Sequence, residues 1–296
     1  MAVSRRVVLA ALGAGTVAGC SGHGSRSGST AGPATSSPGP AGVSASPAPG
    51  SSAGRHARPP APARLPVTRA EIVARYGHRR PRTWGFDAPG VLHALPAGRR
   101  EIALTFDACG GRGGSGYDQA LIAVLRRHRV PATLFINSRW IDENPAVFRE
   151  LAADPLFEIG NHGTRHRPLS VSGRSAYGIP GTRNAGEVFD EVAGNHLKLA
   201  RLLGAPPRYF RSGTAYCDDV AARIVADLGE RVAAFSVNGD GGATFTPAQV
   251  RATIGAAHPG AVVICHMNHP EGGTAEGMAA VLPSLLEAGR RFVRLP

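Results

Sequence analysis

The chain has 296 residues and a formal net charge of +12, nearly all of it from arginine because Lys198 is the only lysine. The arginines are scattered and are not interleaved with aromatic residues, so we expect no nucleic-acid partner. The four cysteines contain no C-x-x-C pair, which excludes a zinc ribbon.

Residues 1–20 have the features of an export signal. Arg5 and Arg6 precede an apolar run that is too short to cross a bilayer as a helix, and small residues follow it. The arginine pair resembles a twin-arginine signal, and the sequence ending at Cys20 resembles a lipobox, whose cysteine receives lipid. We therefore predict an extracytoplasmic lipoprotein held to the membrane by lipidation of Cys20, or a secreted protein if Cys20 is incidental.

Residues 21–66 consist mainly of Gly, Ser, Ala and Pro, with almost no large apolar residue before Leu65. Such a segment cannot bury enough apolar surface to offset its conformational entropy, so we predict a disordered tether. The rest divides into an approach segment over 67–100 and one catalytic domain over 101–296, which is a usual size for a single domain. We expect the protein to be a monomer.

Strand-like and helix-like segments alternate through the domain. In chain order, the pattern predicts strand 101–107, helix 117–128, strand 132–136, helix 145–153, strand 157–159, helix 185–203, strand 208–210, helix 219–228, strands 232–237 and 261–265, helix 275–288 and strand 291–295. This alternation indicates an α/β fold with parallel strands joined by crossover helices. The nearly continuous apolar strands favour a sheet that is covered on both faces.

Four polar residues lie at the ends of predicted strands, namely Asp107, His162, Arg211 and His266. A single aspartate at a strand end often only caps the next helix, but in barrels of this class the carboxyl ends of the strands carry the active site. His166 follows His162 at a spacing that would place both imidazoles on one face of a helical turn. Two neutral imidazoles suit zinc, cobalt or nickel.

The order of these motifs resembles that of the polysaccharide deacetylases, the family-four carbohydrate esterases with a NodB-homology domain. The resemblance covers roughly 101–296 and rests on Thr105-Phe106-Asp107, Gly160-Asn161-His162 with His166, Phe210-Arg211, Ser236 to Asp240, and Ile264-Cys265-His266. It implies a distorted (β/α) barrel of about seven units. It also implies an acetylated polysaccharide as substrate, either cell-wall or chitin-type glycan, from which N- or O-linked acetyl groups are removed.

The same resemblance implies a role for each motif residue. His162 and His166 would bind a divalent metal, zinc in the first place and cobalt or nickel otherwise. Asp107 matches the general base that deprotonates water, and His266 matches the general acid.

Arg211 matches the residue that orients the base, and Asp240 would support the site. A backbone amide near Thr214 would stabilise the oxyanion.

The sequence departs from the family pattern at several positions. Ala108 stands where the family has a second aspartate that binds the metal, so Asp107 is a further candidate ligand. Gly163 stands where Ser or Thr is usual, and Ser212-Gly213 replace the usual prolines. His269 is an additional candidate for the acid or for a ligand.

Cys109 follows the Asp107 strand and Cys217 follows the Arg211 loop, so both should lie on the same rim. We predict a Cys109–Cys217 disulfide, and a thiolate ligand from Cys109 is the rival hypothesis. Cys265 lies in an apolar strand and is expected to be a buried free thiol.

Three other functions compete with the deacetylase. Gly111 to Gly116 match G-x-G-x-x-G between a strand and a helix, as in dinucleotide-binding oxidoreductases, but Asn137 stands where that fingerprint needs an acid. The loss of a carboxylate at Ala108 would suit a non-catalytic glycan-binding lipoprotein. An amidase or cyclic-imide hydrolase on the same fold also remains open.

Overall fold

The computed structural model describes residues 64–296. The predictions for the export signal, for Cys20 and for the tether up to residue 63 therefore lie outside the described residues. No helix between residues 64 and 296 is long and apolar enough to cross a membrane.

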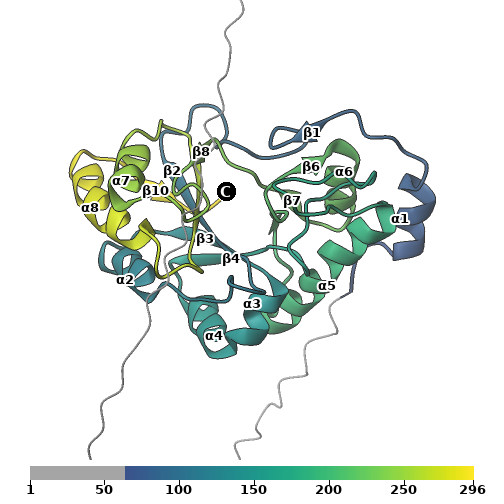
Figure 1. Cartoon of the computed structure of the whole chain (residues 1–296), viewed down its shortest axis with the longest axis horizontal. Helices are drawn as coiled ribbons and strands as arrows, with labels where there is room; N and C mark the ends of the chain where they lie inside the picture. The colour runs from purple at the N-terminus through teal and green to yellow at the C-terminus, as the bar shows by residue number, and fades with distance from the viewer. Residues whose placement is uncertain (1–63) are drawn as a thin grey trace, which may run out of the picture. The chain divides into compact units, whose positions relative to one another are not determined.

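The centre of the fold is one parallel sheet in the order β7-β5-β4-β3-β2-β9-β8, with β10 beside the start of β2 (Figure 1). Its strands are β2 (Ile102–Ala108), β3 (Ala132–Ile136), β4 (Phe157–Asn161), β5 (Tyr209–Phe210), β7 (Arg231–Val232), β8 (Val237–Asn238), β9 (Val262–His266) and β10 (Phe292–Val293). The sheet curls into an open barrel, which confirms the predicted distorted (β/α) barrel of about seven units.

Helices cover the outside of this sheet. They are α1 (Arg69–Tyr76), α2 (Gln119–Arg127), α3 (Ser138–Glu143), α4 (Pro145–Ala153), α5 (Ala185–Leu203), α6 (Asp219–Asp227), α7 (Pro247–Gly255) and α8 (Thr274–Glu287). In Figure 1, α2, α7 and α8 pack together at one end of the sheet, and α1, α5 and α6 pack together at the other. The longest helix, α5, is capped at its start by Asn184, whose side chain accepts from Glu187 N, and at its end by the left-handed Gly204.

Side chains along β2 alternate between the apolar core and the candidate site. Ile102, Leu104 and Phe106 are fully buried in the apolar cluster under α2 and α8. Thr105 and Asp107 point the other way, and both bond the side chain of Arg211. The same strand therefore supplies the core with one face and the site with the other.

The prediction of one strand over 232–237 is wrong. The structure has two short strands there, β7 and β8, which lie at opposite ends of the sheet order. Between them the chain crosses the open side of the barrel, where Leu92 donates to Val232 O and accepts from Ala234 N. The segment changes partners along its length, so it cannot continue as one strand.

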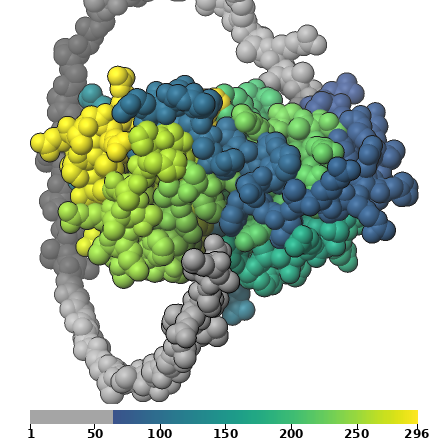
Figure 2. Space-filling model, turned by 90° about the horizontal axis from the view of Figure 1, so that it is seen from above, coloured from purple at the N-terminus to yellow at the C-terminus, as the bar shows by residue number. Residues whose placement is uncertain are grey.

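The predicted approach segment over 67–100 packs tightly on the domain. Helix α1 packs on α5, Ile72 is fully buried, and Leu65 at the end of the predicted tether packs in the same cluster. Strand β1 (Trp84–Gly85) pairs antiparallel with β6 (Cys217–Asp218). Figure 2 shows these first described residues, in purple and blue, on the outside of the molecule.

Candidate active site and metal centre

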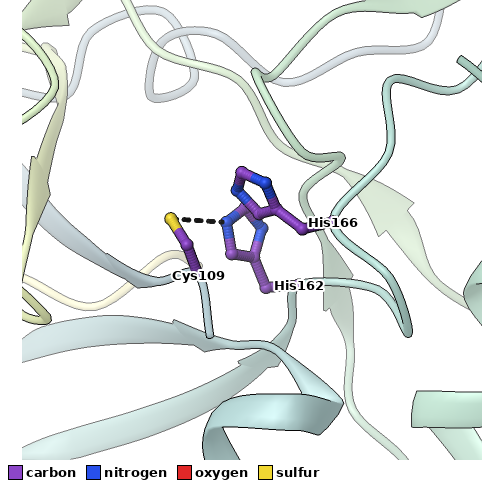
Figure 3. Close-up of side chains that lie close together, drawn as sticks. All are labelled: Cys109, His162 and His166. Atoms are coloured by element: carbon purple, nitrogen blue, oxygen red, sulfur yellow. Dashed lines mark hydrogen bonds between the residues drawn. The ribbon is translucent and has the colours of Figure 1, made fainter. Parts of the chain in front are cut away.

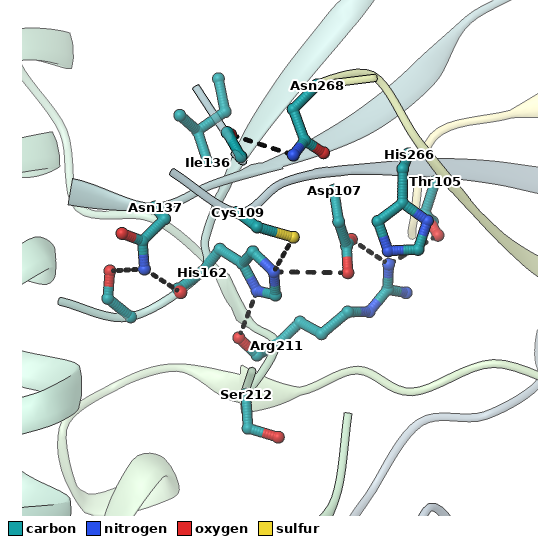
Figure 4. A network of polar contacts seen from close by, with 12 residues as sticks. Thr105, Asp107, Cys109, Ile136, Asn137, His162, Arg211, Ser212, His266 and Asn268 are labelled. Atoms are coloured by element: carbon teal, nitrogen blue, oxygen red, sulfur yellow. Dashed lines mark hydrogen bonds and ion pairs between the residues drawn. The ribbon is translucent and has the colours of Figure 1, made fainter. Parts of the chain in front are cut away.

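The sheet register brings the polar strand ends together. Asp107 on β2 lies directly opposite His266 on β9. Asn161 at the end of β4 lies opposite Phe210 on β5, so His162 and Arg211 follow at the same level. Figure 4 shows these side chains gathered at one end of the parallel strands.

Arg211 is fully buried and holds the carboxylate of Asp107. Its Nη1 lies 2.7 Å from Asp107 Oδ1, and its other nitrogens donate to the backbone oxygens of Ala233 and Ala234. Burial alone would raise the pKa of Asp107, but the positive charges led by Arg211 outweigh it and hold that pKa below its ordinary value. Asp107 is therefore ionised and positioned to accept a proton.

His266 is held by a second buried carboxylate. Asp240 accepts from His266 Nδ1 at 3.0 Å and from the His266 backbone N–H at 2.6 Å. Burial disfavours the imidazolium, but Asp240 and Cys109 outweigh it and raise the pKa of His266 well above its ordinary value. His266 therefore carries a proton that it can donate, and Asp240 orients its ring.

His162 presents one nitrogen to a metal. Its Nδ1 lies 2.9 Å from the backbone oxygen of Arg211, which can only accept, so Nδ1 carries a hydrogen and Nε2 is the nitrogen left to bind a metal. That Nε2 lies 3.5 Å from Asp107 Oδ2 and 3.8 Å from Cys109 Sγ. The ring of His166 stands edge-on to the ring of His162, with centroids 4.7 Å apart.

The two histidines do not share a helical turn, contrary to the spacing argument. They lie on a loop, and His166 adopts a positive φ of 59°. The loop is held by Glu191, whose carboxylate accepts from the backbone N–H groups of Arg165 and Arg167. Gly163 has a φ of +77°, and a Cβ there would overlap Glu191 Oε1, which explains why the usual Ser or Thr is replaced.

Cys109 joins the two histidines to form a candidate metal centre (Figure 3). One donor atom each from Cys109, His162 and His166 lies within 4.8 Å of the others. Burial opposes ionisation of the Cys109 thiol, but the imidazoles of His166, His162 and His266 outweigh it and lower the pKa of Cys109 well below its ordinary value. Two imidazoles and a thiolate fit Zn²⁺, whereas Asp107 lies outside this trio and pairs with Arg211.

The predicted Cys109–Cys217 disulfide does not form in this structure, where both are free thiols. Cys217 is fully buried in the apolar cluster under α5 and α6, and this burial raises its pKa to about 12. Cys109 instead turns toward the histidines. Cys265 is buried and free, as expected.

A cavity of about 340 Å³ opens beside these groups, lined among others by Asp107, His166, Tyr177, Thr214, Phe235 and His266. Thr214, the predicted oxyanion position, has a φ of 73°, and its buried hydroxyl has no hydrogen-bond partner among the described residues. Tyr177 lies on a turn at the cavity and is 74% exposed. Neither Tyr177 nor Glu191 carries a motif signal, so the sequence alone did not identify them.

Two other features that the sequence suggested, His269 and the glycine-rich loop, do not have the predicted roles in this structure. His269 pairs with the exposed Glu271 and does not line the cavity. The glycine-rich loop is held by this chain's own side chains, since Trp140 Nε1 donates to Gly116 O. Asp118 caps the following helix, α2, and places a carboxylate where a dinucleotide phosphate would bind.

Comparison with known proteins agrees with this geometry. The family model for polysaccharide deacetylase matches residues 94–233. The chain is 21% identical over 177 residues to the uncharacterized protein YlxY of Bacillus subtilis, covering 60% of this chain and 51% of YlxY, and thus spans about half of that relative.

The chain is also 23% identical over 201 residues to the peptidoglycan-N-acetylmuramic acid deacetylase PdaA of Bacillus subtilis, covering 65% of this chain and 69% of PdaA. The crystal structure of a CE4 family pseudoenzyme from Bacillus anthracis shares the fold, with a TM-score of 0.59 and 21% identity over 70% of this chain and 68% of that one. The chain is therefore similar to the polysaccharide deacetylases over residues 94–233 and shares their fold, with Ala108 in place of the second motif aspartate.

Proposed function

We propose that this protein is a metal-dependent deacetylase that removes N-linked acetyl groups from a cell-wall glycan. One observation carries the proposal. Asp107 and His266 line one cavity together with the imidazole of His166, and their neighbours lower the pKa of Asp107 and raise the pKa of His266. The amide bond and the glycan are chosen by analogy with PdaA, whose name states that activity.

Each side chain then has a defined task. Asp107 takes the proton from the attacking water, and Arg211 keeps the carboxylate ionised and correctly aimed. A divalent ion at His162 and His166 would supply Lewis acidity toward the acetyl group. His266, aligned by Asp240, gives its proton to the departing nitrogen. The backbone at Thr214 would donate to the oxyanion.

Acetate release tests this proposal directly. The purified full chain is loaded with zinc and given peptidoglycan, N-acetylglucosamine oligomers and O-acetylated xylan. We expect acetate from the N-acetylated glycans, and a fall in kcat of about 10²- to 10⁴-fold in Asp107→Asn and in His266→Ala. Both variants should keep their zinc, whereas His162→Ala should lose it.

The alternative is a non-catalytic glycan-binding protein, which Ala108 and the pseudoenzyme neighbour both favour. It predicts glycan binding by the zinc-loaded chain without acetate release. Acetate release from O-acetylated xylan alone would instead mean that the protein is a deacetylase that cleaves an ester bond and not an amide bond.

We further propose that the protein is exported and anchored through a lipid on Cys20, on the strength of the paired arginines and the lipobox-like sequence. In a bacterial host, the wild type should then fractionate with membranes and Cys20→Ser should not. Equal distribution of the two proteins would exclude the anchor.

A further inference from the structure

Position 108 cannot supply the metal ligand that the family resemblance implies. Ala108 has no donor atom, and its side chain is fully buried in the apolar cluster that also contains Phe106 and Ile136. The next residue, Cys109, lies just past the end of β2 and is partly exposed. A donor is therefore missing at one position and present at the adjacent one.

The Cys109 sulfur lies near the distance from His162 that shared metal coordination requires, and within 4.8 Å of a donor nitrogen of His166. In a tetrahedral zinc site with Zn–N near 2.05 Å and Zn–S near 2.3 Å, the nitrogen and sulfur are about 3.6 Å apart. Cys109 Sγ lies 3.8 Å from His162 Nε2. The His162 ring is fixed at Nδ1 by the Arg211 carbonyl, so Nε2 is the nitrogen available to a metal shared with Cys109.

Asp107 is a weaker candidate for the third ligand. Its Oδ1 is held by Arg211 at 2.7 Å, and although its Oδ2 lies 3.5 Å from His162 Nε2, Asp107 is not among the three residues whose donor atoms all lie within 4.8 Å of one another. Using Asp107 as a ligand would also remove the base that the proposed function needs.

We propose that Cys109, as a thiolate, is the third protein ligand of the catalytic metal in this chain. This inference rests on the proposed function only in calling the metal catalytic. The sulfur binds the metal as a thiolate, and a proton still present on the thiol is released to solvent. Three protein ligands leave a fourth tetrahedral position open, as catalytic zinc sites require.

A thiolate ligand changes which metals the site accepts. Soft sulfur favours zinc and cobalt, whereas carboxylate-rich sites accept magnesium and manganese. We therefore expect this chain to retain zinc in the presence of excess magnesium or manganese.

Cobalt substitution gives a direct readout that does not depend on activity. We expect the full chain loaded with Co²⁺ to show thiolate-to-cobalt charge-transfer absorption in the near ultraviolet. X-ray absorption of the zinc form should show one sulfur at about 2.3 Å. Cys109→Ser should lose both signals and bind zinc roughly 100-fold more weakly or worse, since even indirect partners of a ligand are worth 10–100-fold. Cys217→Ala, which removes a free thiol from the apolar cluster under α5 and α6, should keep both signals.

Thiol alkylation with peptide mapping supplies a second test that needs no variant. In the metal-free protein Cys109 should react with iodoacetamide, and zinc should protect it. Cys217 and Cys265 are fully buried and serve as internal references that stay unreacted in both states.

The possible outcomes separate this inference from the proposed function. Zinc bound without sulfur, or zinc binding that Cys109→Ser leaves unchanged, would overturn the cysteine ligand and leave the deacetylase intact. A sulfur-ligated zinc in a chain that releases no acetate would support the ligand and overturn the deacetylase. A chain that binds no metal would overturn both.

Discussion

Arg211 connects the two halves of the site through one residue. Its guanidinium binds Asp107, and its backbone oxygen accepts from His162 Nδ1. The same guanidinium lies over the ring of Phe135, 4.1 Å from its centroid. Its planar fork donates to a carboxylate and to two backbone oxygens from three separate nitrogens, whereas a lysine would have to reach all three acceptors from one nitrogen. The proposed base and the proposed metal ligand are therefore positioned by the same buried residue.

Gly163 is the residue at which the loop of the metal histidines is most constrained. We predict that Gly163→Ala lowers the free energy of unfolding by about 1–3 kcal/mol, because alanine strains the positive φ and overlaps Glu191. Zinc affinity should also fall, since Glu191 holds the backbone on both sides of His166.

Gly204→Ala is a matched control for this prediction. Gly204 has a φ of +75° but nothing within 4 Å of the added Cβ. Gly204→Ala should introduce the same backbone strain as Gly163→Ala but leave zinc affinity unchanged. Urea unfolding and zinc titration measure the two effects, and equal zinc affinity in Gly163→Ala would show that the loop is not held through Glu191.

At the scale of elements, the sequence predicted those parts of the fold that local patterns determine. Strand β3 and helices α4 and α5 have the predicted bounds, because each combines a clear apolar pattern with plain end signals. Strands β7 and β8 were joined in error because both are short and the run 232–237 is mostly apolar, and only long-range pairing separates them. Helix α7 was missed although Thr246 and Gln249 form a capping box before it.

As with the fold, the sequence predicted those parts of the candidate site that local patterns determine. Polar residues at strand ends could be identified because parallel strands present their carboxyl ends at one edge. The direction of the Cys109 side chain could not be predicted. Cys109 follows a strand and lies on a glycine-rich turn, and contacts with Trp140 and Asn268 set the path of that turn. Cys217 was assigned to the same rim, but pairing of β6 with β1 buries it elsewhere.

The turn that carries Tyr177 is the element most suited to contact a glycan. Tyr177 is 74% exposed at the cavity and stands edge-on to Tyr216, with ring centroids 5.6 Å apart. An aromatic contact is worth about 0.5–1.5 kcal/mol, so we predict that Tyr177→Ala raises KM about 2- to 12-fold and leaves kcat nearly unchanged.

Steady-state kinetics on N-acetylglucosamine oligomers of increasing length measure this effect. Leu202→Ala on α5 removes another exposed apolar side chain and should change neither constant. A loss confined to kcat would place Tyr177 in the chemistry and not in glycan binding.

At the scale of the whole molecule, a buried polar network ties α5 to the sheet beneath the site. Glu230, just before β7, accepts from His196 on α5 at 2.7 Å and from Asn161 at the end of β4 at 2.9 Å. Asn195 extends the network to Ile136 O on β3. The network spans elements that are far apart in the sequence, so its protonation state bears on global stability.

Burial raises the pKa of Glu230 to about 7, and the contacts with His196 and Asn161 only partly oppose this rise. The folded protein therefore holds the Glu230 proton more tightly than the unfolded chain, whose glutamate titrates near 4.5. The resulting stabilisation is complete below about pH 4.5 and is lost as the pH rises through about 7. The loss amounts to about 3 kcal/mol at most.

Glu230→Gln isolates this contribution, because glutamine keeps the acceptor oxygen for His196 and Asn161 but does not titrate. The free energy of unfolding of the variant minus that of the wild type should rise by up to about 3 kcal/mol between about pH 4.5 and pH 8. Urea unfolding at a series of pH values measures the difference. Glu276→Gln on the exposed face of α8 controls for the change in net charge. A difference that stays constant with pH would mean that Glu230 is ionised throughout, and that His196 and Asn161 outweigh its burial.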